Sequence, residues 1–156
     1  MNQAALSDVK VLEFSEFITG PYCGKLLSNQ GAQVIKIEKT GFGDKARSWG
    51  PFSGNLPHPE KSGLFLFLNT NKKSITLNVD TAAGKKIFKE LIKWADVLIE
   101  DHSLKEMKEW GLTYSDIKDI NPSLIMTSIT PFGQTGPYKD YKGNELIAAH
   151  ASTEAF

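Results

Sequence analysis

Short segments rich in aliphatic and β-branched residues alternate along this chain with helical patterns, and this alternation limits the possible folds most. Residues 9–14 and 33–38 have the length and composition of buried strands. Between them, Gly20 and Pro21 mark the beginning of a helix and Gly31 marks its end. A strand, a short helix and a second strand in this order predict a right-handed parallel crossover.

The same alternation continues to the end of the chain. Residues 74–79 alternate apolar and polar side chains, and Asp80 or Thr81 can cap a helix that follows through Phe88 and Ile92. We predict two further strands at 97–99 and 124–129, short helices at 104–110 and 114–120, and a last helix at 144–151. Five strands alternating with helices predict an α/β fold with a doubly wound parallel sheet.

Composition excludes several classes of protein. The 156 residues carry 18 Lys+Arg and 18 Asp+Glu, so no overall field favours nucleic acid or an anionic membrane, and any anion site must be local. The single cysteine, Cys23, excludes an internal disulfide and is expected to be a packed thiol. We expect one cytoplasmic domain, because the chain shows neither the pattern of a signal peptide nor an apolar run long enough to span a membrane. We expect no metal site, because His58, His102 and His150 are scattered along the sequence.

Two stretches rich in Gly and Pro leave alternatives open. Residues 40–62 form either a functional loop or a solvent-exposed insertion, because compact domains seldom keep so long an irregular segment without a use. Residues 130–138 directly follow a predicted strand and form either a mobile lid or an ordinary sharp connection.

The loops that follow parallel strands share one edge of the sheet, where ligands bind in such folds. Main-chain N–H groups near Gly20 could hold a phosphate there, with charge from four basic residues whose alternative role is solvated surface charge: Lys39, Arg47, Lys72 and Lys73. Glu38 ends the second strand where dinucleotide folds place the acid that binds ribose, which suggests NAD. However, the first turn lacks the three-glycine spacing of the dinucleotide fingerprint.

An ordered series of short motifs covers nearly the whole chain. In order, these are VLE at 11–13, GP at 20–21, GAQVIKIE at 31–38, GD at 43–44 with Arg47, NKKSITL at 71–77, ADVLIE at 95–100, GL at 111–112, NP at 121–122 and FGQTGP at 132–137. Together they resemble the class III CoA-transferase family, which contains formyl-CoA and carnitine CoA-transferases. The resemblance implies a Rossmann-like, doubly wound, mostly parallel sheet of about five or six strands with flanking helices.

The resemblance also implies a domain organisation. Residues 1–156 would be the N-terminal part of a CoA-binding large domain, in a subunit that interlocks with a second copy as a homodimer. The family's nucleophilic Asp, which attacks the acyl-CoA thioester, would lie beyond Phe156 together with the remaining domains.

Site residues follow from the resemblance position by position. The implied coenzyme A contacts are Ile18, Lys39, Leu77, Asn78, Asp101, His102 and Lys142. Lys39 and Lys142 would meet phosphate groups, and Glu145 matches an auxiliary acidic position near the transferase active site. Racemases of the family have a His where this chain has Asn144, so the resemblance favours transfer over racemisation.

These observations lead to three hypotheses of function. The first is a CoA-transferase portion that binds coenzyme A or acyl-CoA for transfer of CoA to a small carboxylic acid, inactive alone and without a metal. The second is a catalytically dead fold or binding module, and the third is an NAD-dependent oxidoreductase domain that depends on Glu38. Whether the chain is an enzyme by itself stays open at this point.

Overall fold

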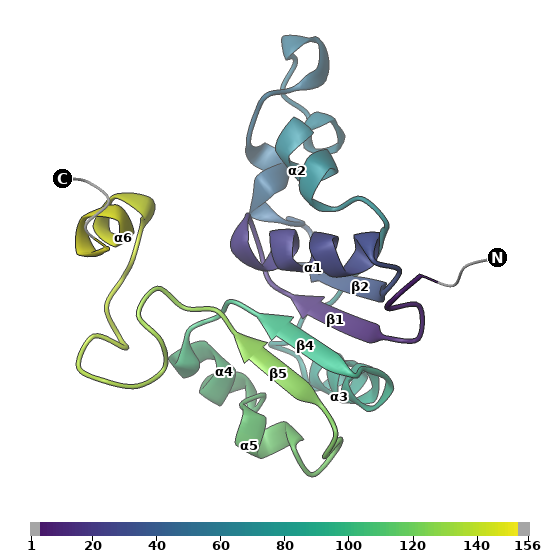
Figure 1. The fold of residues 1–156 in the computed structure, drawn as a ribbon, viewed down its shortest axis with the longest axis vertical. Coiled ribbons are helices and arrows are strands. Elements are labelled where there is room, and N and C mark those ends of the chain that lie inside the picture. The colour runs from purple at the N-terminus through teal and green to yellow at the C-terminus, as the bar shows by residue number, and fades with distance from the viewer. Residues whose placement is uncertain (1–3, 153–156) are drawn as a thin grey trace.

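The protein is built around a five-stranded sheet in which every pair of neighbouring strands is parallel. The computed structural model describes residues 4–152. The strands are β1 (Lys10–Phe14), β2 (Gln33–Glu38), β3 (Lys72–Thr76), β4 (Val97–Glu100) and β5 (Ile125–Ser128), in the spatial order β3-β2-β1-β4-β5 (Figure 1). The predicted α/β fold with a doubly wound parallel sheet is therefore confirmed.

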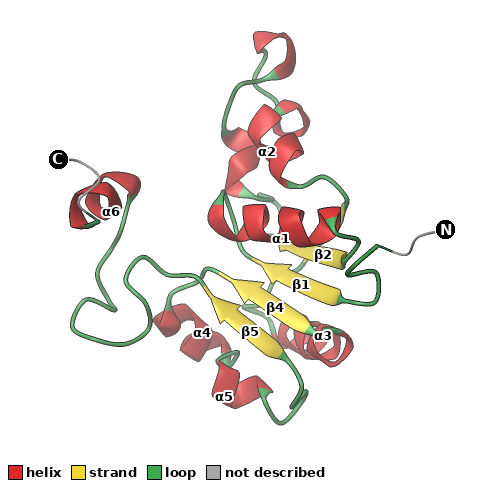
Figure 2. Cartoon of the chain, viewed as in Figure 1, coloured by secondary structure: helices red, strands yellow, loops and turns green. Residues whose placement is uncertain are grey.

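Helices cover both faces of the sheet (Figure 2). One face carries α1 (Thr19–Asn29), with α2 (Gly63–Leu68) beside it, and the opposite face carries α3 (Ala82–Trp94), α4 (Leu104–Trp110) and α5 (Tyr114–Ile117). The last helix, α6 (Glu145–Ala151), lies apart from the sheet at the end of the long connection that follows β5 (Figure 1). No helix in residues 4–152 is long and apolar enough to cross a bilayer.

The face covered by α3, α4 and α5 holds the larger hydrophobic core. Leu12 of β1 and Leu98 of β4 pack there with Phe88 and Ile92, whose spacing places them on one side of α3. Thr81 caps α3, since its Oγ1 accepts a hydrogen bond from the N–H of Gly84 at 3.0 Å. These predicted features are all present.

The face covered by α1 has a smaller apolar cluster and brings the helix close to charged groups. Val11, Val34 and Ile99 pack against Cys23 and Leu27 of α1. Glu13 points to this same face, and a Cβ added at Gly24 of α1 would overlap its Oε2 atom. Glycine at position 24 therefore allows α1 to lie over a buried carboxylate.

Two elements differ from expectation. The third strand ends at Thr76, so Leu77 and Asn78 lie in the loop after β3 rather than in the strand. Helix α2 was not predicted, because its continuous run of apolar residues lacks the 3.6-residue periodicity of an amphipathic helix. Ser62 caps this helix: its Oγ accepts a hydrogen bond from the Phe65 N–H at 3.1 Å. Residues 40–62 are largely irregular and contain three short 3₁₀ turns, Lys45–Ser48, Ser53–Asn55 and Pro59–Lys61.

Candidate functional site

A cavity of about 880 Å³ opens where β1, β2, β3 and β4 end at the carboxyl edge of the sheet. Strand β1 pairs with β2 on one side and β4 on the other: the chain runs outward from β1 through β2 to β3, then crosses back to β4 and continues to β5 in the opposite direction. Ligands of open parallel sheets bind at such a switch point, because the loops diverge and leave a crevice. Residues from the loops after all four strands line the cavity, together with Phe52, Pro57, Pro59 and Trp110.

The irregular segment 40–62 contributes much of the cavity wall. Phe42, Asp44, Arg47 and His58 all line it. Gly43, directly before Asp44, has φ +72°, a backbone conformation that favours glycine, so the chain can turn sharply at this point. Of the two roles left open for this segment, the geometry supports the functional loop.

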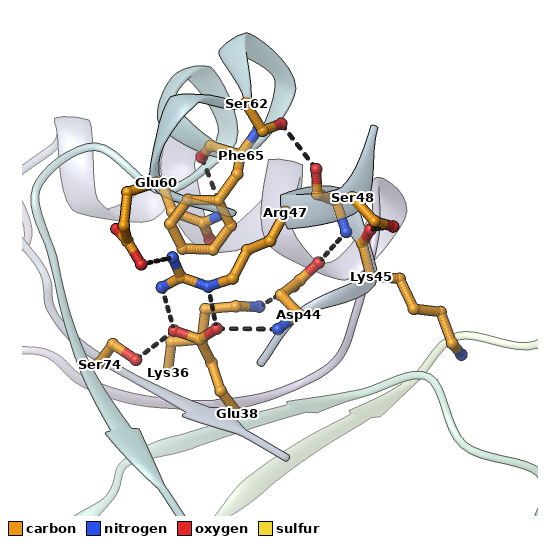
Figure 3. A network of polar contacts seen from close by, with 12 residues as sticks. Lys36, Glu38, Asp44, Lys45, Arg47, Ser48, Glu60, Ser62, Phe65 and Ser74 are labelled. Carbon is orange, nitrogen blue, oxygen red and sulfur yellow. Dashed lines mark hydrogen bonds and ion pairs between the residues drawn. The ribbon is translucent and has the colours of Figure 1, made fainter. Parts of the chain in front are cut away.

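Glu38 and Arg47 fix the wall at the end of β2 (Figure 3). Arg47 donates from Nε to Glu38 Oε2 at 2.7 Å and from an η nitrogen to Oε1 at 2.9 Å, and Ser74 Oγ also donates to Oε1. The Asp44 N–H donates to Oε2 at 2.8 Å. Burial acts to raise the pKa of Glu38, but the Arg47 and Ser74 hydrogen bonds outweigh it and lower this pKa to about 2.

This arrangement removes the basis of the NAD hypothesis. Glu38 is 3% exposed, and its two carboxylate oxygens already accept from Arg47, Ser74 and the Asp44 N–H. A ribose hydroxyl would have to displace these donors. The residue at the position of a dinucleotide acid is here part of the loop's internal structure.

A second charged cluster lies behind this wall, between the sheet and α1. Lys36 Nζ lies 2.9 Å from Glu13 Oε1 and 2.7 Å from Asp44 Oδ2, and Lys72 Nζ lies 2.7 Å from Glu13 Oε2. All four side chains are 0–1% exposed. Burial acts to lower the pKa of Lys36, but Glu13 and Asp44 outweigh it and raise this pKa, whereas burial dominates at Lys72 and lowers its pKa.

Arg47 and Lys72 are therefore not free to pair with a ligand phosphate. Both cations are engaged by carboxylates of the protein, Arg47 by Glu38 and by Glu60 at 2.7 Å, and Lys72 by Glu13. Lys73 is exposed on β3 and does not line the cavity. The sequence alone could not distinguish a phosphate partner from an internal ion pair, because it does not show whether the partner of a basic side chain is a ligand or a buried acid.

Lys39 is the basic residue of the cavity wall that has no carboxylate partner among residues 4–152. Its Nζ lies 5.6 Å from the centre of the Phe42 ring. Lys45, which also lines the cavity, is 2.6 Å from Glu16 Oε2, and its pKa is raised chiefly by that hydrogen bond. An unpaired ammonium at this edge is suited to a phosphate oxygen.

Aromatic side chains form the opposite end of the cavity. The His102 ring lies 4.2 Å from the Phe14 ring and 5.0 Å from the Trp110 ring, measured between centroids. Burial lowers the pKa of His102, so the ring is neutral near pH 7, and its Nε2 has no hydrogen-bond partner among the described residues. Trp110 Nε1–H donates to Asp80 at 2.8 Å. The cavity therefore combines a cationic edge with an apolar, aromatic end.

The structure places the predicted contacts in three groups. Lys39, Leu77, Asn78 and His102 all line the cavity, although they are far apart in the sequence. Asp101, Ile18 and Lys142 do not line it: Asp101 accepts from the Glu16 N–H in the loop after β1, Ile18 directly precedes α1, and Lys142 lies in the connection to α6. Glu145 begins α6, and its side chain lies outside the described part of the structure.

Sequence analysis missed Lys36 and Asp44, which hold the loop from behind. One signal was available: Glu13 and Lys36 are direct neighbours in the parallel register of β1 and β2. Opposite charges at paired positions of two buried strands indicate an internal ion pair.

Among residues 4–152, no group of three or more His, Cys, Asp or Glu side chains is arranged to hold a metal ion.

A doubly wound α/β sheet with a cavity over the carboxyl ends of its strands has the arrangement in which open α/β proteins bind their ligands. Comparison with known proteins identifies the family. Residues 6–155 match the model of CoA-transferase family III, and the chain belongs to that family. The sequence-based identification is thereby confirmed.

Individual relatives support this membership. The chain is 41% identical over 138 residues to succinyl-CoA–D-citramalate CoA-transferase of Chloroflexus aurantiacus, covering 88% of this chain and 33% of the relative. It is 39% identical over 150 residues to formyl-CoA:oxalate CoA-transferase of Escherichia coli, covering 96% and 35%. A CAIB/BAIF family protein from Brucella suis superposes with a TM-score of 0.87 at 35% identity, covering 96% of this chain and 39% of that one. The chain spans about a third of the length of these curated relatives.

Proposed function

We propose that this chain is the coenzyme A-binding part of a CoA-transferase that moves CoA from an acyl-CoA to a small carboxylic acid. The observation that carries the proposal is the cavity at the strand ends, where Lys39 has no carboxylate partner in the described part of the chain, in a member of CoA-transferase family III. Relatives are named for transfer of CoA between carboxylic acids, which supports the substrate class.

Lys39 would meet a phosphate of CoA, and Leu77, Asn78 and His102 would contact the rest of its nucleotide. The aromatic end offers apolar surface to a heteroaromatic base, and the cationic edge offers charge to phosphate. Lys142 and Ile18 remain part of the proposal as contacts outside the cavity wall, and Glu145 as an auxiliary acid near the acyl group.

Binding and turnover are separate parts of this proposal. The family resemblance places the nucleophilic Asp beyond Phe156, so the 156 residues would bind CoA without transferring it. Residues 1–156 would then act as the N-terminal part of a larger domain, and a second copy would complete the assembly. A turnover assay with acyl-CoA and a carboxylate acceptor tests this point, and robust activity of the purified chain would contradict it.

Isothermal titration tests the binding itself. We expect micromolar affinity for CoA and a loss of roughly tenfold or more in Lys39→Ala, because a charge-assisted contact contributes about 1.5–3 kcal/mol. Pantetheine, which has the thiol arm without phosphates, should bind both proteins with equal affinity. Lys86→Ala, an exposed change in α3 away from the cavity, is the matched control.

Two outcomes would overturn the assignment. No heat at millimolar CoA would favour the alternative of a catalytically dead fold that acts through protein contacts. Equal loss of CoA and pantetheine affinity in Lys39→Ala would show that Lys39 shapes the cavity without meeting a phosphate.

A further inference from the structure

The loop after β1 is held by buried charged side chains that come from other parts of the chain. Lys36 Nζ of β2 donates to the Ser15 carbonyl at 2.8 Å. Asp44 Oδ1 accepts from the Phe17 N–H at 3.1 Å. Phe17 has φ +68°, a conformation that a non-glycine residue keeps only when its surroundings impose it. Contacts with Lys36 and Asp44, rather than the local sequence of the loop, therefore determine its shape.

Asp101 supplies the third anchor. The Glu16 N–H donates to both carboxylate oxygens of Asp101, at 3.0 Å to Oδ2 and 3.2 Å to Oδ1. Lys36 and Asp44 are in direct ion contact with each other, whereas Asp101 has no ion pair within 4.0 Å among residues 4–152. Of the three anchors, Asp101 is the one whose charge no cation neutralises at close range.

This anchor bears directly on the cavity. Glu16 lines it, and Glu16 Oε2 holds Lys45 Nζ at 2.6 Å at the same rim. A shift of the Glu16 backbone would move both its own side chain and the Lys45 ammonium. Asp101 does not line the cavity, so it can act on a ligand only through the loop.

We propose that Asp101 is a positioning residue for CoA binding: its ionised carboxylate holds the Glu16 amide, and the cavity wall loosens when that carboxyl takes up a proton. This inference rests on the proposed CoA-binding function and adds its regulation by pH. A carboxylate accepts with both oxygens, whereas a carboxylic acid turns one of them into a donor, so it keeps at most one of the two contacts with the Glu16 N–H, and that one is weaker because the acceptor is neutral.

The surroundings of Asp101 place this change in an accessible pH range. Burial raises the pKa of Asp101 to about 7, although the hydrogen bond from the Glu16 N–H acts in the opposite direction. The charged groups facing it are the side chains of Glu16 after β1, Lys36 of β2, Lys45 in the loop after β2 and Glu100 of β4. Glu16 and Glu100 favour the protonated acid, and the two lysines favour the carboxylate.

The first test needs no ligand. In protein labelled with ¹⁵N and ¹³C, the Glu16 amide resonance and the Asp101 side-chain carboxyl carbon should titrate together with a midpoint near pH 7. In Asp101→Asn, the Glu16 amide should lose this titration and resemble the low-pH form of the wild type. A Glu16 amide that does not follow the Asp101 carboxyl would overturn the proposal.

The second test measures CoA affinity against pH. At about pH 8, Asp101→Asn should bind CoA roughly five- to tenfold more weakly than the wild type, and the two should converge near pH 5.5. The CoA phosphate monoester itself titrates near pH 6, but it does so equally with both proteins, so the ratio of their affinities isolates Asp101. Asp119→Asn, an exposed change after α5, should match the wild type throughout.

The two measurements fail in different ways. An affinity ratio that stays constant with pH, with the amide titration intact, would show that the anchor exists but does not position the cavity. No CoA binding by the wild type, with the amide titration intact, would overturn the proposed function and, with it, the role of Asp101 in binding. Thermal melts of both variants at each pH confirm that the compared proteins are folded.

Discussion

The two faces of the sheet are buried by different chemistry. Under α3, α4 and α5, the interior is apolar, with Leu12, Phe88 and Leu98 at 0% exposure. Under α1, the equally buried interior contains Glu13 and Lys36, at 0% and 1% exposure. Apolar burial stabilises without direction, whereas an ion pair requires fixed geometry.

The position of the charged face explains this difference. Lys36 and Asp44 join the sheet interior to the loops after β1 and β2, and these loops form the cavity wall. Most of the apolar face lies beneath helices, and only its edge, with Phe14 and Trp110, reaches the cavity. The buried charges, whose desolvation is unfavourable, therefore lie where loop geometry decides whether a ligand fits.

The largest expected effect is that of Lys36→Met, which breaks the charged face. It leaves Glu13 and Asp44 without their shared cation, and removing one partner of a buried pair destabilises by about 3–5 kcal/mol. Urea unfolding at neutral pH measures the loss. Glu13 keeps Lys72, but Asp44 is left without an ion-pair partner within 4.0 Å among residues 4–152, so the loss should shrink as the pH falls and carboxyl groups become neutral.

Leu98→Ala on the apolar face is the matched control for that experiment. A buried Leu truncated to Ala costs about 2–5 kcal/mol through lost burial and the cavity left behind. No charge changes, so this loss should stay the same across the pH range. If both variants respond to pH alike, the two faces do not differ in the way their chemistry indicates.

A somewhat smaller effect is expected for Glu38→Gln at the rim of the charged face. With a folded pKa of about 2 against an ordinary value of 4.5, Glu38 contributes about 3 kcal/mol of stability above pH 4.5. The sign follows from the lowered pKa, so the contribution is lost as the pH falls from 4.5 toward 2. Urea unfolding at pH 6 should show the full loss in Glu38→Gln.

Glu90→Gln supplies the control for this prediction. Glu90 pairs with Lys93 on the exposed surface of α3, where such a pair contributes less than about 1 kcal/mol. Its removal should leave both the stability and its acid dependence nearly unchanged. An equal acid response in the two variants would contradict the depressed pKa of Glu38.

The apolar face was the more predictable of the two. Periodic apolar residues, such as Phe88 and Ile92, and cap residues, such as Thr81, carry their structural role in their spacing, because burial and capping are local rules. The family resemblance predicted the cavity residues Lys39 and His102, and the strand-end argument had also named Lys39, but neither source predicts the surroundings of these side chains.

The charged face was not predictable in the same way. A lysine in a strand has the same letter whether it faces solvent or a buried acid, and only the pairing of β1 with β2 brings Lys36 beside Glu13. For this reason the sequence left Arg47 and Lys72 open between phosphate partner and solvated surface charge, and the structure shows both paired with acids of the protein. The position of Asp101 behind the loop rather than in the cavity likewise depends on a backbone contact, with Glu16, that no side-chain pattern encodes.

The smallest expected effect is at the junction between the apolar face and the cavity. Thr81 Oγ1 accepts from Gly84 N–H at 3.0 Å and donates to the Asn78 carbonyl at 2.9 Å, so one hydroxyl joins the cap of α3 to a residue of the cavity wall. Thr81→Ala should cost about 1 kcal/mol of stability in urea unfolding. Thr81→Ser keeps the hydroxyl and should restore most of that loss. If Thr81→Ala also weakens CoA binding while Thr81→Ser does not, the hydroxyl that caps α3 also positions the cavity wall at Asn78. Unchanged CoA affinity in both variants would limit the role of this hydroxyl to stability.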